Sequence, residues 1–202
     1  QQRLSDFHTL LAAFFLALQQ QTGRTDMIIR VANANRDAAF PGIESLTGCL
    51  ADALPLRLAL QTGDDLTAVA LKVKQKMLEA LRHAGLSSQD IAELPIGRQD
   101  DGPVVLSPVG MSFVPMHHLG KGSPMPVQNI RCRTALPFTD ISLICFIEND
   151  HLKCCLNYDE ALFDERDIIR IKDRFLHFLT PSRPSPLLSP PLEMPSVQLF
   201  PS

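Results

Sequence analysis

Apolar residues recur with helical spacing in three segments of the chain. In residues 65–83 they fall at steps of three and four, which places them on one stripe of a helix, with lysine and glutamate over the rest of its surface. Residues 164–179 show the same pattern behind Asp164, a favourable N-cap residue. Residues 5–22 are more uniformly apolar, which predicts a buried helix with Ser5 and Gly23 as its caps. The predicted core-facing stripes are Leu66, Val69, Val73, Met77 and Ala80 in residues 65–83, and Ile168, Ile171, Phe175 and Phe178 in residues 164–179.

Strand-like segments take up much of the remaining chain. Residues 27–32 predict a short strand, and residues 103–114 predict one with an interruption. Residues 140–148 and 151–159 predict a hairpin around an Asn-Asp turn, because both residue types tolerate the backbone of a tight turn. The first arm is apolar on both faces, so we expect it to be an interior strand. The order of the elements predicts an α/β fold, a mixed sheet with flanking helices.

Three segments have no clear periodicity. Residues 48–60 alternate irregularly, and Pro55 argues against a central position in a sheet. Residues 87–94 are a candidate for a short helix. From Thr180 onward the chain is rich in proline and serine, which predicts an interdomain linker over residues 180–202, either disordered or extended along a neighbour.

The bulk composition excludes several classes of partner. The 202 residues are 45% hydrophobic and 20% charged, as in a globular protein, and the net charge of -3 gives no basic surface for nucleic acid. The absence of Trp and the single Tyr also make a base-stacking platform improbable. The apolar run at residues 10–18 is too short to span a bilayer. We therefore expect no nucleic-acid partner, no membrane partner and a cytoplasmic location.

The cysteines are odd in number and form no CxxC motif. This pattern favours reduced, buried thiols in a cytoplasmic protein. A zinc site built from Cys132 with His117 or His118 is the alternative, but the spacing fits no common template, so we expect no metal. The five cysteines are Cys49, Cys132, Cys145, Cys154 and Cys155.

Four stretches, in this order, resemble the C-terminal half of the condensation domain of nonribosomal peptide synthetases. Residues 10–36 resemble a helix, a Thr-Gly turn and a strand that ends in Arg. Residues 46–57, "LTGCLADALPLR", resemble the motif (I/V)GxFVNTLPLR. Residues 139–152 resemble the following strand pair, and residues 156–179 resemble the closing Tyr-Asp, Leu-Phe-Asp and helix pattern. The order and spacing agree over residues 9–180.

This resemblance implies one lobe of a chloramphenicol-acetyltransferase-like fold, in which two lobes enclose a V-shaped cleft. Residues 1–179 would form an incomplete C-terminal lobe. Donor and acceptor carrier domains would deliver an acyl or peptidyl thioester and an aminoacyl thioester on phosphopantetheine arms, and no cofactor would bind directly. The catalytic HHxxxDG motif of the family lies on the N-terminal lobe, so we expect that this chain alone is inactive. Other implied partners are the missing N-terminal lobe and adjacent domains of the same synthetase.

The adjacent pair His117 and His118 looks like that signature at first sight. In "HHLGKGS", however, Gly122 and Ser123 stand where the signature has Asp and Gly. The pair also follows the LPLR motif, whereas the family's signature precedes it. We therefore expect no catalytic role for these histidines, with general-base catalysis as the alternative, and we assign no catalytic residue to this chain.

The Arg at the end of residues 10–36 and the LPLR motif supply the candidate cleft positions, with some departures from the family. Asp52 stands where Asn is usual, and an ionised Asp offers acceptors only, which puts a polar contact to substrate at this place in doubt. We expect the two arginines to form structural, partly buried ion pairs, with a solvated charge as the alternative. The candidate positions are Arg36, Gly48, Asp52, Leu54, Pro55 and Arg57.

Three functions fit these motifs. The first is amide bond formation as part of a condensation domain. The second is a catalytically silent condensation-like module that recruits or positions partner domains, which the altered LPLR motif favours mildly. The third is an epimerase or ester-forming relative with the same fold. An intact HHxxxDG motif upstream of Gln1 would favour an enzyme over a silent module.

Overall fold

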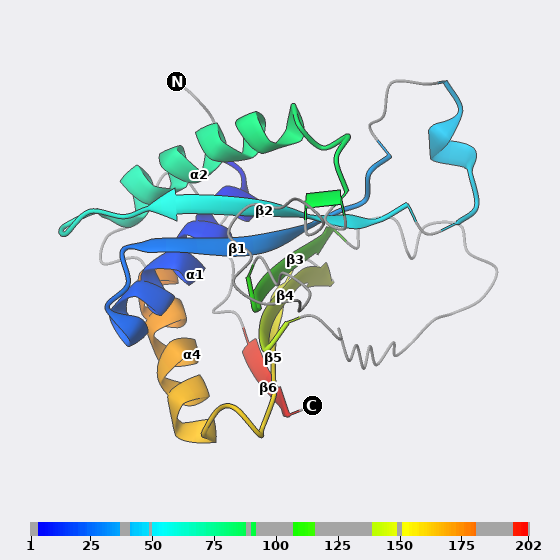
Figure 1. The fold of residues 1–202 in the computed structure, drawn as a ribbon. Helices are drawn as coiled ribbons and strands as arrows, with labels where there is room; N and C mark the ends of the chain where they lie inside the picture. The colour runs from blue at the N-terminus through cyan, green and yellow to red at the C-terminus, as the bar shows by residue number, and fades with distance from the viewer. Residues whose placement is uncertain are drawn as a thin grey trace, which may run out of the picture.

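The described part of the chain forms one mixed sheet with helices packed against it. The structure, a computed structural model, describes residues 4–36, 41–48, 50–87, 90–91, 107–115, 139–148, 151–180 and 196–201. Its helices are α1 (Asp6–Thr22), α2 (Leu66–Leu81) and α4 (Glu165–Leu179), with a short 3-10 helix η1 (Ile43–Ser45). Its strands are β1 (Asp26–Asn33), β2 (Asp52–Ala59), β3 (Val109–Pro115), β4 (Ile141–Glu148), β5 (His151–Tyr158) and β6 (Ser196–Pro201). The strand order is β2-β1-β3-β4-β5-β6 (Figure 1), so the predicted fold class is confirmed.

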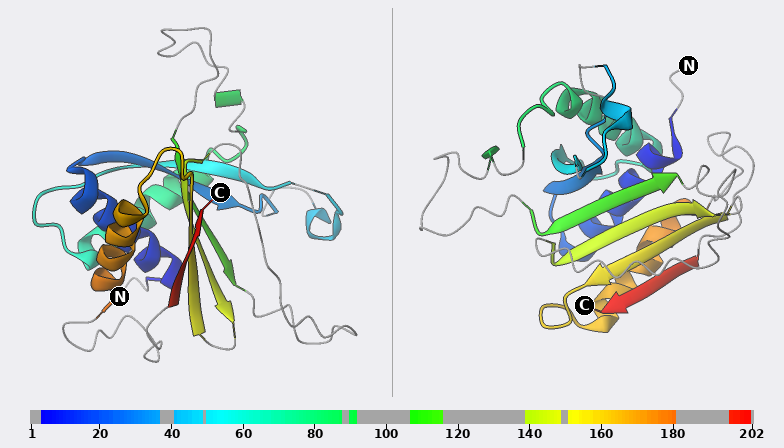
Figure 2. Two further views of the ribbon diagram at one scale, coloured as in Figure 1. Left: turned by 90° about the horizontal axis from the view of Figure 1, so that it is seen from below. Right: turned by 90° about the vertical axis from the view of Figure 1, so that its right-hand side faces the viewer.

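Helix α1 lies between α2 and α4 in a layer that covers one face of the sheet (Figure 2). Because α1 has neighbours on several sides, every residue from Thr9 to Leu18 is buried, which explains its uniformly apolar sequence. The Phe14 ring of α1 meets the Phe175 ring of α4 edge to face, with centroids 6.5 Å apart. The two rings lie at the centre of the main hydrophobic core.

The helices lie where the sequence predicts them, although α2 ends at Leu81, two residues before the predicted end. The Ser5 hydroxyl accepts a hydrogen bond from the amide of His8, and Gly23 closes α1 in the left-handed conformation with φ of 71°. Asp65 caps α2 and Asp164 caps α4 through their carboxylates. The predicted apolar stripes of α2 and α4 all contact the core, so these three helix predictions are confirmed.

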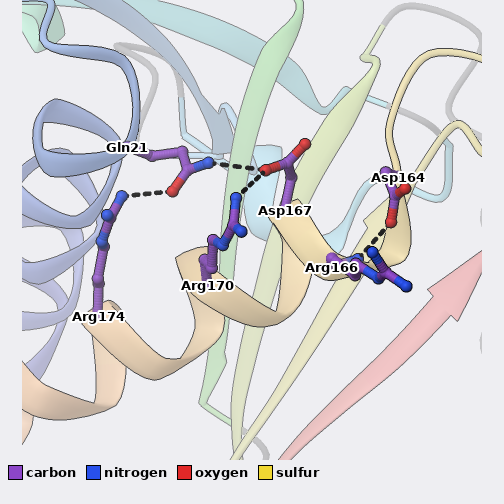
Figure 3. A network of polar contacts seen from close by, with 6 residues as sticks. All are labelled: Gln21, Asp164, Arg166, Asp167, Arg170 and Arg174. Carbon is purple, nitrogen blue, oxygen red and sulfur yellow. Dashed lines mark hydrogen bonds and ion pairs between the residues drawn. The ribbon is translucent and has the colours of Figure 1, made fainter.

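A polar network links the end of α1 to α4 (Figure 3). The side-chain Nε2 of Gln21 donates to the carboxylate of Asp167 over 3.1 Å, and the Arg174 guanidinium donates to the side-chain Oε1 of Gln21. Arg170 also donates to Asp167 over 3.1 Å. The side chain of Gln21 thus bonds a carboxylate and a guanidinium at once, and these bonds fix the relative position of the two helices.

Strands β4 and β5 pair as the predicted antiparallel hairpin. Strand β4 is an interior strand, with β3 parallel to it on its other side, so this prediction is confirmed. In β5, residues Leu152, Cys154, Leu156 and Tyr158 all point to the buried side, as their alternation indicates.

The ambiguous segment around Pro55 forms β2, which pairs with β1 alone and lies at the edge of the sheet. An edge strand accommodates proline because its outward backbone groups need no partner strand. The reasoning that kept Pro55 out of a central position is therefore confirmed.

Strand β6 was not predicted, because it lies in the segment assigned to an interdomain linker. It pairs in parallel with β5 over its whole length and places Leu199 against the core. Prolines surround the strand, and its partner lies some forty residues earlier, so no local pattern indicates it. This part of the tail therefore extends the folded sheet, while the connection to a following domain remains a prediction.

Some predictions fall wholly or partly outside the described residues. The Asn-Asp turn, most of the short helix at 87–94 and the first part of the strand at 103–114 lie there. At the start of the short helix, the Ser87 hydroxyl accepts a hydrogen bond from the amide of Asp90 over 3.0 Å, as an N-cap does. In the part of the chain that is described, no helix has the length and apolar character needed to cross a membrane.

Candidate functional site

The candidate site residues lie on strands β1 and β2 and on the segment that joins them. The two strands stay paired up to Asn33 and Asp52, and beyond this pair the connection that carries η1 projects from the sheet (Figure 1). The strand pair thus fixes both ends of a loop, while the loop itself stands away from the helix layer.

Arg36 holds this loop together through backbone carbonyls. Its guanidinium donates to the carbonyl oxygens of Ile43 over 3.1 Å, Leu46 over 2.8 Å and Gly48 over 3.0 Å. The planar guanidinium presents several donors in a fixed geometry, which suits such a cluster of acceptors. The expectation of an ion pair for Arg36 is corrected, because among the described residues the guanidinium donates to carbonyl oxygens and not to a carboxylate. A lysine at this position could not donate to the three carbonyls in the same planar arrangement.

The backbone conformation at position 48 requires a glycine. Its φ of 154° is one that residues with a side chain rarely adopt, although an added Cβ would meet no atom within 4 Å. Its carbonyl is also one of the three acceptors for Arg36. The glycine therefore serves the shape of the loop and does not make room for a neighbour.

Asp52 lies at the end of β2 next to the loop, and the side chain of Leu54 faces the core. A carboxylate oxygen of Asp52 accepts a hydrogen bond from the amide of Ala53 over 2.7 Å. This contact uses an acceptor, as an ionised aspartate can. Leu54 is 6% exposed and belongs to the buried face of β2 with Leu56 and Leu58. A packing role accounts for Leu54.

Arg57 forms the bidentate ion pair expected of it, but on the surface. Its Nε lies 2.9 Å from Oδ1 of Asp26 and its Nη2 lies 2.5 Å from Oδ2. The two residues are diagonal neighbours across β1 and β2. The hydrogen bond from Arg57 holds the pKa of Asp26 below its usual value. The side chains are 72% and 46% exposed, so the expectation of a partly buried pair was wrong.

A row of residues that the sequence analysis did not single out crosses the other face of the sheet. The register pairs Arg30 of β1 with Pro55 and Gly110, then Gly110 with Ser142, and Ser142 with Asn157. By strand alternation these residues share the face opposite the helix layer, where Arg30, Pro55 and Asn157 are half-buried and Ser142 is only 4% exposed. An arginine, a hydroxyl and an amide can bind carbonyl and amide groups, and none is a strong base or nucleophile at neutral pH.

The sequence alone does not indicate this row, because its residues are neighbours only through the pairing of separate strands. Ser142 lies within an apolar segment, and Gly110 lies in a strand with no turn signal. At Gly110 an added Cβ would lie 2.9 Å from Cγ2 of Thr139, so the glycine is required by close packing. A pattern of pairing between distant strands would be needed to find this row.

The described residues contain no obvious catalytic constellation. Ser5 and His8 lie in hydrogen-bond contact, with Oγ and Nδ1 2.6 Å apart, but they form the capping box at the start of α1. Burial, and next the charge of Lys74, lower the pKa of His8. Within the described ranges, no group of three His, Cys, Asp or Glu side chains could hold a metal. His117, His118 and Cys132 lie outside the described residues, so the expectations for them stay untested.

Comparison with known proteins identifies the family. The model of the Condensation domain family matches residues 5–182. Malpinin synthetase of Mortierella alpina is 29% identical over 170 residues, which covers 81% of this chain and 2% of that protein. Nonribosomal peptide synthetase sidD of Aspergillus fumigatus is 25% identical over 162 residues, which covers 79% of this chain and 8% of that protein. The chain thus spans only a small part of the length of these relatives.

Solved structures show the same fold. The four-domain nonribosomal peptide synthetase AB3403 superposes with a TM-score of 0.70 at 14% identity, over 87% of this chain and 14% of that chain. The starter condensation domain of rhizomide synthetase superposes with a TM-score of 0.62 at 17% identity, over 85% of this chain and 40% of that chain. The fold is therefore the expected chloramphenicol-acetyltransferase-like one. Because the family model covers most of the sequence, the chain belongs to the condensation domain family.

Proposed function

We propose that this chain is the C-terminal lobe of a condensation domain that forms amide bonds in the biosynthesis of a nonribosomal peptide or a peptide-polyketide hybrid. The observation that carries this proposal is the match of the Condensation domain family over residues 5–182, which takes in α1 to α4 and five of the six strands. The names of the relatives, which are peptide synthetases, support the same product class.

In the proposed reaction, the amine of an acceptor aminoacyl thioester attacks the carbonyl carbon of a donor acyl or peptidyl thioester. A C–N bond forms, the C–S bond breaks, and the donor thiol is released with the proton of the amine. Both thioesters are carried on phosphopantetheine arms of carrier domains, which are substrates here and not resident cofactors. Holding the two thioesters in line supplies much of the acceleration in such a reaction.

The residues of this chain suit a wall that positions substrates. Arg36 fixes the loop at the end of β1 and β2, and the half-buried Arg30 and Asn157 place polar groups on the face opposite the helices. None of these side chains supplies a neutral-pH base. We therefore assign proton transfer to the histidine of an N-terminal lobe and no catalytic residue to this chain.

The proposed partners follow from this division. They are a donor carrier, an acceptor carrier, the N-terminal lobe and the adjacent domains of the synthetase, all in the cytoplasm. The segment from Thr180 to Ser202 would connect this lobe to the next domain, with β6 as its part within the sheet.

The parent condensation domain with both lobes tests this proposal. Purified domain is mixed with a loaded donor carrier and a loaded acceptor carrier, and mass spectrometry of the acceptor carrier detects the new amide. We expect product, and we expect it to persist within about tenfold when His117 and His118 are both changed to Ala. An alanine at the second histidine of an upstream HHxxxDG motif serves as the inactive control.

The other outcomes distinguish the alternative functions. A folded parent domain that yields no product with any loaded pair would support the silent module. An acceptor whose stereochemistry is inverted without a new bond would support an epimerase, and a new ester would support the ester-forming relative. A thousandfold loss in the double alanine variant would show that the pair at 117 and 118 acts in the reaction.

A further inference from the structure

Two thiols face each other inside the sheet. Cys145 of β4 and Cys154 of β5 are direct partners in the antiparallel register. Their sulfur atoms lie 3.2 Å apart, and the residues are 0% and 1% exposed. Both are reduced in this structure. Neither takes part in the proposed reaction, so their juxtaposition needs a separate account.

The backbone pattern shows which kind of cross-strand pair they form. The amide of Ile141 donates to the carbonyl of Pro108, on the side of β3, and the amide of Asp159 donates to the carbonyl of Asp140. Hydrogen-bonded and non-hydrogen-bonded pairs alternate along an antiparallel ladder, so Cys145 and Cys154 fall in a non-hydrogen-bonded pair. Such pairs have Cα atoms about 4.5 Å apart, with their side chains closest.

This geometry meets the main requirement for a disulfide. Cα separations of about 4.4–6.8 Å permit the bond without a large movement of the backbone. The two sulfur atoms are already in contact, so bond formation requires a local rotation and a small approach of the side chains.

We propose that Cys145 and Cys154 are a dithiol site that a small thiol oxidant converts to a disulfide across β4 and β5. Two S–H bonds break and one S–S bond forms. The two hydrogens and two electrons pass to the oxidant, which is a diazene reduced to a hydrazine or a low-molecular-weight disulfide reduced to two thiols. The product ties two interior strands of the sheet, and a dithiol reductant restores the starting state.

Cys155 provides a matched control within the same strand. It pairs with Ile144 and points to the opposite face, because successive side chains of a strand alternate. It is also less buried than Cys154. If exposure alone decided the reaction, Cys155 would react first. If the cross-strand geometry decides, the bond forms between Cys145 and Cys154.

The sequence offers a direct readout. Lys153 lies between the two cysteines, so trypsin separates residues 134–153, which hold Cys145, from residues 154–166, which hold Cys154 and Cys155. Purified protein is treated with the diazene oxidant diamide under native conditions, free thiols are blocked with N-ethylmaleimide, and the digest is analysed by mass spectrometry. We expect these two peptides to appear linked and to separate after dithiothreitol.

Serine variants assign the bond. The linked pair should vanish in Cys145→Ser and in Cys154→Ser and should persist in Cys155→Ser. Because both thiols are buried, the reaction is repeated just below the melting transition, where the strands open more often. The proposal is overturned if both conditions leave Cys145 and Cys154 fully available to N-ethylmaleimide after denaturation, or if the link persists in Cys154→Ser and is lost in Cys155→Ser.

Discussion

The two faces of the sheet use the same strands for different purposes. On one face, Leu56, Met111 and Leu143 pack under the three helices and are almost fully buried. On the other face, Arg30, Gly110, Ser142 and Asn157 are successive register partners across β1, β3, β4 and β5. The strand alternation therefore gives the sheet one packed face and a second face that we propose positions substrates, and substitutions on the two faces should have different effects.

The largest expected effect is on the helix-covered face. Phe14→Ala removes a fully buried ring from the contact between α1 and α4, where the surrounding helices cannot close the space. We expect a loss of about 3–5 kcal/mol in the free energy of unfolding, measured by denaturant titration. The control is Leu78→Ala on the exposed side of α2, where the change should stay within about 0.5 kcal/mol. Similar losses for the two variants would contradict the packed-face assignment.

The next effect concerns close packing on the other face. Gly110→Ala places a methyl group 2.9 Å from Cγ2 of Thr139, which should destabilise the fold by about 1–3 kcal/mol. Thr139→Ser removes that Cγ2 atom, so the double variant should recover most of the loss. A double-mutant cycle of unfolding free energies measures this coupling. Additive changes in the unfolding free energy would mean that contact with Thr139 is not the reason for a glycine at position 110.

The loop held by Arg36 should respond locally. Arg36→Ala removes the hydrogen bonds that hold three loop carbonyls, two of them at exposed positions. We expect the amides of Ser45 and Leu46, which are bonded within this turn, to exchange with deuterium at least about tenfold faster, while the global transition changes little. Arg57→Ala serves as the control with unchanged exchange. Unaltered exchange in Arg36→Ala would refute the role of this arginine.

The smallest effect is expected at the exposed pair of Arg57 and Asp26. Arg57→Ala should change the melting temperature by less than about 3 °C at neutral pH, and salt should reduce the difference. The folded-state pKa of Asp26 is depressed, so any contribution of the pair is present above the ordinary value of 3.8 and is lost as the pH falls through the lower folded pKa. Melting curves of both proteins over acid pH check this sign. A difference that grows with acidification would contradict it.

The sequence predicts the parts of this molecule that depend on neighbours along the chain. Caps and stripes identify α1, α2 and α4, and the Asn-Asp turn identifies the hairpin of β4 and β5, because these signals lie within a few residues of one another. Strand β6 cannot be predicted in this way, because its partner strand is remote in the sequence and its own segment is rich in proline.

The site shows the same limit. The family resemblance locates Arg36 and Arg57 but cannot say whether each meets a carboxylate or a carbonyl. Arg57 and Asp26 are 31 residues apart and meet only through the register of β1 and β2. The row through Ser142 depends on pairing among five strands, which no local spacing encodes.

The central claim is that this chain supplies one wall of a condensation site and needs another lobe for chemistry. The most direct test mixes the purified 202-residue chain with loaded donor and acceptor carriers, with and without a separately expressed N-terminal lobe that carries HHxxxDG. Mass spectrometry of the acceptor carrier should detect no amide with the chain alone and partial recovery with the second lobe. Amide formed by the chain alone, above a blank without protein, would contradict the account and direct attention to Asp52 and His118.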